Sequence, residues 1–594
     1  MQTAHEKAKH FMEHETQFHL GALPTEQAHP RTRGLAETLQ DDTAAGVRMI
    51  LDVDNDILPV AQRVLCGPDL AKLVDAIVRA AESGRKIFFT GCGATGRLSI
   101  LLEACWRRFW RGMSEHGGDL ALLADRFGDR VFSVMAGGDH ALIRSVEGYE
   151  DFTDFGKHQL TEQGVGEGDV VVAITEGGET SFVIGTAWRG LEAGAEVFFV
   201  YNNPSDVLCR CVERSREVIE EPRITTLDLA SGPMAVAGST RMQATTSELL
   251  VVGAAVETAL TTLLRSHLSD ADLELLGAPI APPSHYHEGF ARLIEQLRQP
   301  GAVEAIAGMI EFEEEIYEAG GLVTYLAHDY LLDILTDTTE RNPTFMLPPF
   351  RKVDDTLSPP SWAFVKNPLY ETPDAWLQLL QRPLRGLSWT PETYRRMGAP
   401  EEYHHNPPPL SNDEILKFSI GNEDDPSRHE SPQTAAIAVL VGAETAELMR
   451  EGHTFRDRAS LLMEPFGRSA VLSVGAKPPP DAGTDVVYHV PCELPESPLM
   501  LWPRLAIKLV LNTVSTATMG RMGRLVSNWM AHVETTNKKL IDRGTRLISE
   551  LAGVDYRTAC IALHETLETL AQSNDPSQER PSPVQATLRR IGAR

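Results

Sequence analysis

The sequence predicts an α/β protein in which one chain contains two parallel-sheet domains and ends in a helical region. Its 594 residues are too many for one hydrophobic core. Short apolar runs typical of buried strands alternate with segments of helical length, and this favours a parallel sheet with helices on both faces. The same alternation returns more faintly in the second half of the chain.

The clearest strands and helices lie in the first half. We predict strands at 86–90, 130–135, 169–175 and 196–201, with helices at 141–163, 181–193 and 245–264. The second half supplies weaker candidates: strands at 321–327, 435–441, 470–474 and 486–490, and helices at 330–338 and 504–526.

The predicted domain boundaries follow from these elements. A polar leader covers residues 1–45 and a first domain covers 46–270. A second domain covers 286–526 and contains a long irregular insertion at about 342–432, where Pro, Trp and acidic residues are frequent. Residues 527–594 form a helical cap and a tail, which we expect to be loose from Ser573 onward.

Composition excludes several classes of function. With 55 basic and 83 acidic residues, the net charge of −28 disfavours binding to nucleic acid or to a membrane surface. The N-terminus lacks the apolar core of a signal peptide, and the seven scattered cysteines do not indicate a disulfide framework. We therefore expect a cytoplasmic protein. His10 and His14 could share a helix face, but no further ligand completes a metal site, so we predict no metal and no cofactor.

Three segments could bind an anion. The segments are GCGATG at 91–96, EGGETS at 176–181 and AGSTRM at 237–242. The first two follow strands and the third precedes a buried helix. Because ligands bind at the carboxyl ends of parallel strands, these glycines and hydroxyls suggest one phosphate-binding site. The alternative is that they are ordinary tight turns and helix N-caps. The first segment matches neither a dinucleotide fingerprint nor a P-loop convincingly.

These segments resemble the sugar isomerase (SIS) domain. Together with AGGDHALIRSVEGYED at 136–151, LPTEQAHPRTRGL at 23–35 and KLVLNTVSTATMGRMGRLVSNWM at 508–530, they are similar to the N-acetylmuramic acid 6-phosphate etherases and glucokinase regulatory protein. The resemblance implies two flavodoxin-like, three-layer SIS domains and a helical cap in one chain. The second domain lacks the glycine loop, since HDYLLDIL follows its first strand, so we expect one ligand site.

The resemblance also implies which residues bind a sugar phosphate. The expected set is Gly93, Thr95, Glu150, Thr175, Gly177, Thr180, Ser239, Thr240, Glu340 and Lys508. Lys508 would reach in from the second half, and Glu340 would bind a sugar hydroxyl. The chain departs from the family at Ala94 and Glu179.

One further departure concerns catalysis. The etherase reaction eliminates lactate and needs a base and an acid, which two Glu residues supply. Glu150 matches one of them, whereas the other is expected about nine residues after Gly96, where Cys105 stands. Glu103 is two positions earlier, roughly 200° around a helix, and would face away. This loss favours a protein that binds without turnover.

Three functional hypotheses follow. The first is a regulatory sensor that binds a phosphorylated ketose or amino sugar, as glucokinase regulatory protein does, with a sugar kinase as the expected class of protein partner. The second is an etherase-type carbon–oxygen lyase in which Glu150 is catalytic. The third is a sugar-phosphate isomerase or deaminase. Because two related halves in one chain remove the need for a second copy, we expect a monomer with an internal pseudo-dimer, or a weak homo-oligomer.

Overall fold

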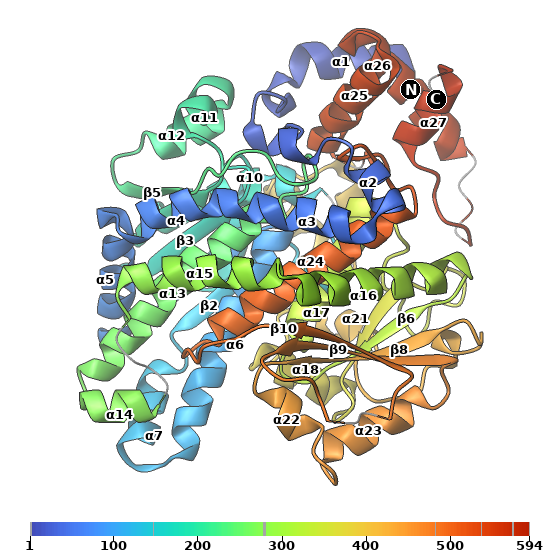
Figure 1. Cartoon of the computed structure of the whole chain (residues 1–594). Coiled ribbons are helices and arrows are strands. Elements are labelled where there is room, and N and C mark those ends of the chain that lie inside the picture. Colours follow the sequence, from blue (N-terminus) through green and yellow to red (C-terminus); the bar gives the residue numbers. More distant parts are fainter. Residues whose placement is uncertain are drawn as a thin grey trace.

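Two five-stranded parallel sheets lie side by side in the computed structural model, and helices cover both (Figure 1). The structure describes residues 3–146, 148–276, 281–480, 483–535, 537–572, 575 and 577–592. Helix α24 (Leu501–Arg521) packs against α13 of the first half and against α16 and α17 of the second, so it joins the two halves. The α/β class is confirmed.

Sheet one has the strand order β2-β1-β3-β4-β5, and every pairing in it is parallel. Its middle strand β3 has the sequence VVVAIT and is buried at all six positions, as expected of a strand covered on both faces. The strands are β1 Ile87–Gly91, β2 Val131–Met135, β3 Val170–Thr175, β4 Glu196–Tyr201 and β5 Ile224–Asp228. The first four match predicted strands, and β5 was not predicted.

Sheet two repeats this topology. Its order, read from one edge, is β7-β6-β8-β9-β10, so β6 takes the place of β1 and β7 the place of β2. Part of the predicted irregular insertion is therefore regular, because β7 belongs to this sheet. The strands are β6 Val323–Leu326, β7 Ala363–Lys366, β8 Ala435–Val441, β9 Arg468–Gly475 and β10 Val486–Pro491. A short hairpin, β11 Leu525–Val526 and β12 Trp529–Met530, follows α24.

Helices supply the outer layers and the layer between the sheets. Those of the first half are α2 Leu35–Asp41, α3 Thr43–Val53, α4 Ile57–Leu65, α5 Pro68–Glu82, α6 Ala94–Glu115, α7 Gly118–Phe127, α8 His140–Ile143, α9 Thr153–Glu162, α10 Ser181–Glu192, α11 Ser205–Cys211, α12 Glu213–Ile219, α13 Gln243–Arg265 and α14 Asp270–Leu275. Those of the second half are α15 Pro283–Leu297, α16 Pro300–Glu318, α17 Leu331–Phe345, α18 Thr372–Leu380, α19 Pro391–Arg396, α20 Glu401–His405, α21 Asn412–Leu416, α22 Glu444–Leu448 and α23 Thr454–Met463.

The N-terminal leader and the C-terminal cap meet at one side of the molecule (Figure 1). The cap comprises α25 Lys538–Ala552, α26 Tyr556–Gln572 and α27 Pro583–Arg590. Helix α1 (Ala4–His14) packs on α26 through a small apolar cluster of Ala8, Phe11, Phe18 and Cys560. Part of the tail predicted to be loose thus forms α27, whereas residues 573, 574, 576, 593 and 594 lie outside the described residues.

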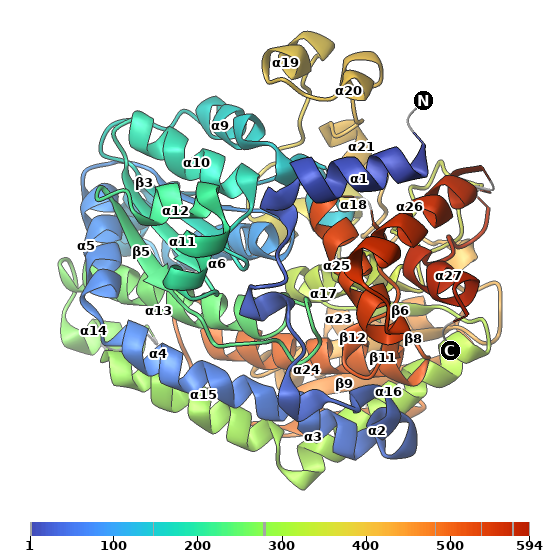
Figure 2. The ribbon, with the colours of Figure 1, turned by 90° about the horizontal axis from the view of Figure 1, so that it is seen from above.

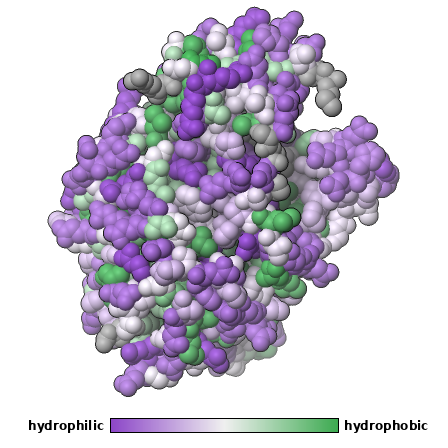
Figure 3. Space-filling view, turned by 90° about the vertical axis from the view of Figure 1, so that its right-hand side faces the viewer, coloured by the Kyte–Doolittle hydropathy of each residue, from purple (hydrophilic) through white to green (hydrophobic). Residues whose placement is uncertain are grey.

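Hydrophilic side chains dominate one face of the surface, and a long apolar helix is buried. On the face shown in Figure 3, hydrophilic side chains dominate and hydrophobic ones occur in small scattered groups. Within the described residues, α13 alone is long and apolar enough to cross a membrane by length and composition. It is the core helix of the first half, since 89% of its most apolar window is buried inside the structure.

A segment of the second half, residues 387–410, contacts the first half, and we call it the arm. Its helices α19 and α20 project from the body of the molecule (Figure 2). At the base of the arm, Leu387 and Leu410 form an antiparallel bridge. Farther out, Trp389 and Tyr394 pack in an apolar cluster with Tyr149 and Phe155 of the first half. The arm therefore contacts the segment that carries Glu150.

The close contact between helices α9 and α10 allows a test of how much their packing contributes to the stability of the first half. They touch at Gly156, where a Cβ atom would lie 2.0 Å from the carbonyl oxygen of Phe182. We expect Gly156→Ala to destabilise the protein by about 2 kcal/mol, because the overlap outweighs a gain of about 1 kcal/mol in helix propensity. Urea unfolding measures the change. Gly112→Ala is the matched control, since a Cβ there meets nothing within 4 Å, and equal midpoints for the two variants would contradict the packing argument.

Candidate functional site

One cavity collects residues from all three predicted anion-binding segments. Its volume is about 170 Å³, and it lies where strands β1 and β3 end and α6 and α10 begin. Six of the ten predicted ligand-binding residues line it: Gly93, Glu150, Thr180, Ser239, Thr240 and Glu340. The segments around Gly93, Thr180 and Ser239 are therefore close together, as a single phosphate site requires. Their role in binding stays a prediction.

The backbone of the first segment suits an anion. Gly93 has φ +57° and precedes α6, a conformation that side chains other than glycine rarely adopt. A Cβ at Gly91 would lie 2.4 Å from the carbonyl carbon of Thr95, so only glycine permits this tight turn. Neither α6 nor α10 has a side-chain N-cap hydrogen bond. The first backbone N–H groups of both helices, with the partial positive charge of the helix ends, are left for a ligand.

The remaining four predicted residues support the wall rather than form it. Thr95 Oγ1 accepts from Cys92 N at 3.0 Å and donates to Cys92 O, which closes the first turn. Thr175 Oγ1 donates to Thr180 Oγ1 at 3.1 Å, and Gly177 O accepts from Asn203 Nδ2 at 2.9 Å. Lys508 Nζ donates to Arg241 O at 2.9 Å and Thr246 Oγ1 at 2.7 Å. Lys508 therefore supports the third segment through hydrogen bonds and does not line the cavity.

The N-terminal leader also holds the third segment. Gly238 N donates to Thr25 O at 3.1 Å, and Asn203 Oδ1 accepts from Thr25 N at 3.1 Å. A Cβ at Gly238 would lie 2.6 Å from Nε of Arg543. The missing side chain thus admits Arg543, which forms a bidentate ion pair with the buried Glu26 at 2.8 and 2.6 Å. The leader segment at 23–35 thus contacts the site directly, through Thr25 and Glu26.

The expected second carboxylate is not absent from the cavity. Cys105 is buried in the core, and Glu103 is buried beside Ser133, so neither reaches the cavity wall. Glu340 of α17 does line the cavity, together with Glu150. The cavity wall thus has two carboxylates although position 105 is a cysteine, and the expectation of binding without turnover stays a prediction.

The pseudo-symmetry of the two halves explains where the second carboxylate comes from. Helix α17 follows β6 as α6 follows β1, and the two helices contact each other. Glu340 on α17 forms a buried ion pair with Arg97 on α6. Cys105 on α6 correspondingly lies near Asp333 on α17, on the side of the second half. The equivalent positions of the two helices therefore face the opposite halves: Glu340 of α17 faces the first half, and Cys105 of α6 faces the second.

Two elements fix the position of Glu150. It lies in the 3-10 helix Tyr149–Asp151, where the Tyr149 and Tyr394 hydroxyls are hydrogen-bonded and the Tyr149 ring stacks on Trp389 at 5.8 Å between centroids. Asn537 of the cap donates its side-chain amide to Glu150 Oε1. Burial raises the pKa of Glu150 above its ordinary value, and the nearby Glu179 adds to the shift while Lys539 opposes it.

Several residues of the wall were not predicted. They are Arg97, Glu176, Arg241, Asn537, Lys539 and Arg543. The cations among them already have carboxylate partners in Glu340, Asp337, Glu179 and Glu26. Burial raises the pKa of Glu176 to about 7. Only Glu176 and Arg241 belong to the quoted glycine and hydroxyl segments. The cap residues lie in ETTNKKLIDRGTRLISELAGV at 534–554, a segment that shares the family resemblance but was not assigned to the site.

The parallel sheets and the loops at their strand ends are those of a SIS-domain protein, and comparison with known proteins places it more narrowly. The family model for the glucokinase regulatory protein N-terminal SIS domain matches residues 69–189. N-acetylmuramic acid 6-phosphate etherase from Mesorhizobium japonicum is 31% identical over 242 residues, which are 40% of this chain and 68% of that protein. Etherase 1 from Bacillus licheniformis is 28% identical over 237 residues, 39% of this chain and 67% of that protein.

These similarities identify the family. The chain belongs to the N-acetylmuramic acid 6-phosphate etherase and glucokinase regulatory protein family, as predicted. It spans about two thirds of the length of the curated relatives it matches. Among solved structures, the C-terminal domain of glucosamine-fructose-6-phosphate aminotransferase from Francisella tularensis has a TM-score of 0.43 at 11% identity, covering 80% of this chain and 94% of that one.

The structural role of the buried Glu103, which lies outside the cavity, can be tested by its effect on stability. Burial alone would raise the pKa of Glu103, but Arg382, Arg385 and Arg107 outweigh burial and lower this pKa to about 2. Glu103 is thus a structural anchor for the arm. We expect Glu103→Gln to destabilise the protein by about 3 kcal/mol at pH 7, because Arg385 loses its carboxylate partner while Arg382 and Arg107 keep only Asp139 and Asp129.

The pH dependence of this loss has a defined sign. A lowered folded-state pKa contributes stability above the ordinary pKa of about 4.5, and that stability is lost as the pH falls toward 2. The difference between the variant and the wild type should therefore shrink over this range in urea unfolding curves. Exposed Glu115→Gln on the same helix is the control and should change stability little. A constant difference at all pH values would contradict the role of the Glu103 charge.

Proposed function

We propose that the protein is an etherase-type lyase that removes the 3-O-lactyl group of N-acetylmuramic acid 6-phosphate or a related sugar phosphate. The observation that carries this proposal is the pair of carboxylates, Glu150 and Glu340, on the wall of one cavity with the three anion-binding segments. The similarity to etherases from several bacteria supports the same function. With Glu340 present, the substitution at Cys105 is no argument against turnover.

The proposed reaction needs two proton transfers. One group removes the proton on the carbon beside the carbonyl, the carbon–oxygen bond to the lactyl group breaks, and a carbon–carbon double bond forms. The other group gives a proton to the departing oxygen, and water then adds to the double bond. Glu150 and Glu340 supply the two groups. Glu340 has Arg97 as a partner, while burial raises the pKa of Glu150, so the two carboxyl groups sit in different environments.

The phosphate would be bound mainly by neutral donors. The hydroxyls of Ser239 and Thr240 line the cavity, and no hydrogen bond engages them among the described residues. The N-termini of α6 and α10 add backbone N–H groups. Lys539 is one of the cations on the cavity wall, and it is already paired with Glu179 at 2.8 Å.

A second candidate function is a sensor that binds the sugar phosphate without converting it. The match of residues 69–189 to the glucokinase regulatory protein SIS domain favours it. Both candidates need the same phosphate site and differ in whether the carboxylates perform chemistry. A turnover assay separates them.

Lactate release from N-acetylmuramic acid 6-phosphate is the test of the lyase. We expect turnover by the wild-type protein, and a loss of at least a hundredfold in kcat in both Glu150→Gln and Glu340→Gln, because each amide cannot exchange the required proton. Glu115→Gln is the control and should keep full activity. Tight binding of the substrate by the wild type without any lactate would reject the lyase and leave the sensor.

Phosphate binding is tested separately from chemistry. Ser239→Ala combined with Thr240→Val should weaken binding of N-acetylglucosamine 6-phosphate by tenfold or more in calorimetry, because two hydroxyl donors are lost. Thr262→Val serves as the control, since that exposed hydroxyl donates to Thr258 O of its own helix. Unchanged affinity in the double variant would show that the phosphate binds elsewhere.

A further inference from the structure

A second cavity adjoins the one that holds the two carboxylates. We call it the vestibule; Arg144, Pro348, Phe350 and Arg580 are among its lining residues. Its volume is about 400 Å³, more than twice the 170 Å³ of the inner cavity. Ser145, Pro343 and Leu540 line both cavities, so the two share a boundary. The proposed reaction on a monosaccharide leaves the vestibule without a role.

The vestibule adjoins the carboxylate side of the inner cavity. The shared Ser145 is five residues before Glu150, and Pro343 lies three residues after Glu340 on α17. The phosphate-side residues Gly93, Thr180, Ser239 and Thr240 line only the inner cavity. A sugar held by its phosphate, with its ether oxygen near the carboxylates, would therefore direct its ether substituent toward the vestibule.

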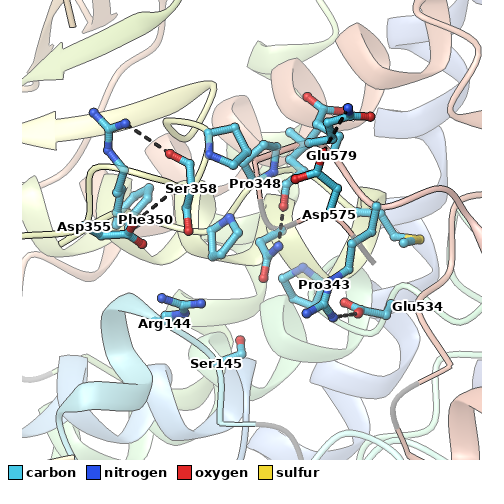
Figure 4. Close-up of a pocket in the computed structure, with 18 of the residues that line it drawn as sticks. Arg144, Ser145, Pro343, Pro348, Phe350, Asp355, Ser358, Glu534, Asp575 and Glu579 are labelled. Atoms are coloured by element: carbon cyan, nitrogen blue, oxygen red, sulfur yellow. Dashed lines mark hydrogen bonds and ion pairs between the residues drawn. The ribbon is translucent and has the colours of Figure 1, made fainter. Parts of the chain in front are cut away.

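Arg144 differs from the other arginines of the vestibule in its hydrogen bonds and ion pairs. Arg351 Nη1 donates to Ser358 O at 3.1 Å, and Arg580 pairs with Glu534 at 2.8 Å. Among the described residues, neither a hydrogen bond nor an ion pair engages the half-buried Arg144 guanidinium. Figure 4 shows Arg144 and Ser145 on one side of the vestibule, with Asp355, Phe350 and Pro348 across it. Asp355 Oδ1 accepts from Leu357 N and Ser358 N.

The guanidinium of Arg144 suits an anionic ligand group, whereas carboxylates stand elsewhere on the vestibule wall at Asp355, Glu534, Asp575 and Glu579. Desolvation lowers the pKa of Arg144; Asp355 opposes this shift and Arg580 adds to it. A planar guanidinium binds a carboxylate through two parallel hydrogen bonds. The other walls are apolar at Pro343, Pro348 and Phe350 and polar at Glu534 and Glu579 of the C-terminal region. This mixture suits a short peptide, with an apolar side chain, backbone amides and a terminal carboxylate.

We propose that the vestibule binds an amide-extended ether substituent, so that the protein accepts sugar 6-phosphates whose 3-O-lactyl carboxyl carries an amino acid or a short peptide. Arg144 binds the terminal carboxylate of that extension and determines specificity for it. This inference rests on the proposed function, because it assumes that the ether-bearing side of the sugar faces Glu150 and Glu340. A lactyl group without an extension would leave most of the vestibule empty.

The test compares two substrates and one ligand on the full chain. The substrates are N-acetylmuramic acid 6-phosphate and its L-alanyl amide, and the ligand without a substituent is N-acetylglucosamine 6-phosphate. We expect the wild type to convert the alanyl substrate with at least the kcat/KM of the free acid. Arg144→Gln should lower kcat/KM for the alanyl substrate tenfold or more, mostly through KM, and leave the Kd of N-acetylglucosamine 6-phosphate unchanged. Exposed Arg210→Gln is the control.

The outcomes separate this inference from the proposed function. Conversion of the free acid but not of the alanyl substrate would overturn the vestibule proposal and leave the lyase standing. An equal effect of Arg144→Gln on all three compounds would also overturn it. If neither substrate is converted, the lyase fails, and binding decides: the alanyl compound must then bind more tightly than N-acetylglucosamine 6-phosphate and lose this advantage in Arg144→Gln. Equal affinities in the wild type would reject the vestibule site.

Discussion

The ion pair between Arg97 and Glu340 is the interaction on which the site depends. Arg97 is fully buried, and its guanidinium also donates to Leu142 O and to Ala141 O at 2.9 Å, so its position is set by the first half. A buried guanidinium without its carboxylate would be strongly destabilising. The pair therefore fixes α17 of the second half against α6 of the first. As a result, the Glu340 carboxylate stays at the wall of a cavity whose anion-binding loops belong entirely to the first half.

Charge balance inside the cavity follows the same principle. Arg97, Arg241, Lys539 and Arg543 each have an acidic partner, so their positive charges are largely neutralised before a ligand arrives. The chain carries a net charge of −28, which repels an anion at long range. Selectivity for a phosphate must then come from short-range donors, namely backbone N–H groups and hydroxyls, because these act only on an anion already in place. This explains why glycine, serine and threonine dominate the three segments.

Much of the fold was predictable because its signals are local. The run VVVAIT indicates β3, and GCGATG indicates the turn into α6, without reference to any distant residue. Strand β7 was missed because its four residues AFVK lie inside a Pro-rich stretch with no period of their own. Glu340 was expected at the site from the family resemblance alone, as a ligand of a sugar hydroxyl, and its ion pair with Arg97 was not predicted. Glu340 and Arg97 are 243 positions apart, and only the pairing of the two halves brings them together. No sequence spacing encodes that contact.

The two halves have divided one site between them. At the corresponding place in the second half, β6 is followed by His328, Asp329 and Tyr330 instead of glycines, and Asp333 is closed off by a buried ion pair with Arg504. Cys105 lies near that pair and is itself buried. An acid at position 105 would face this ion pair of the second half and would not reach the cavity of the first. The pairing of the two halves thus explains the geometry at both positions: Cys105 faces the second half, whereas Glu340 faces the cavity of the first.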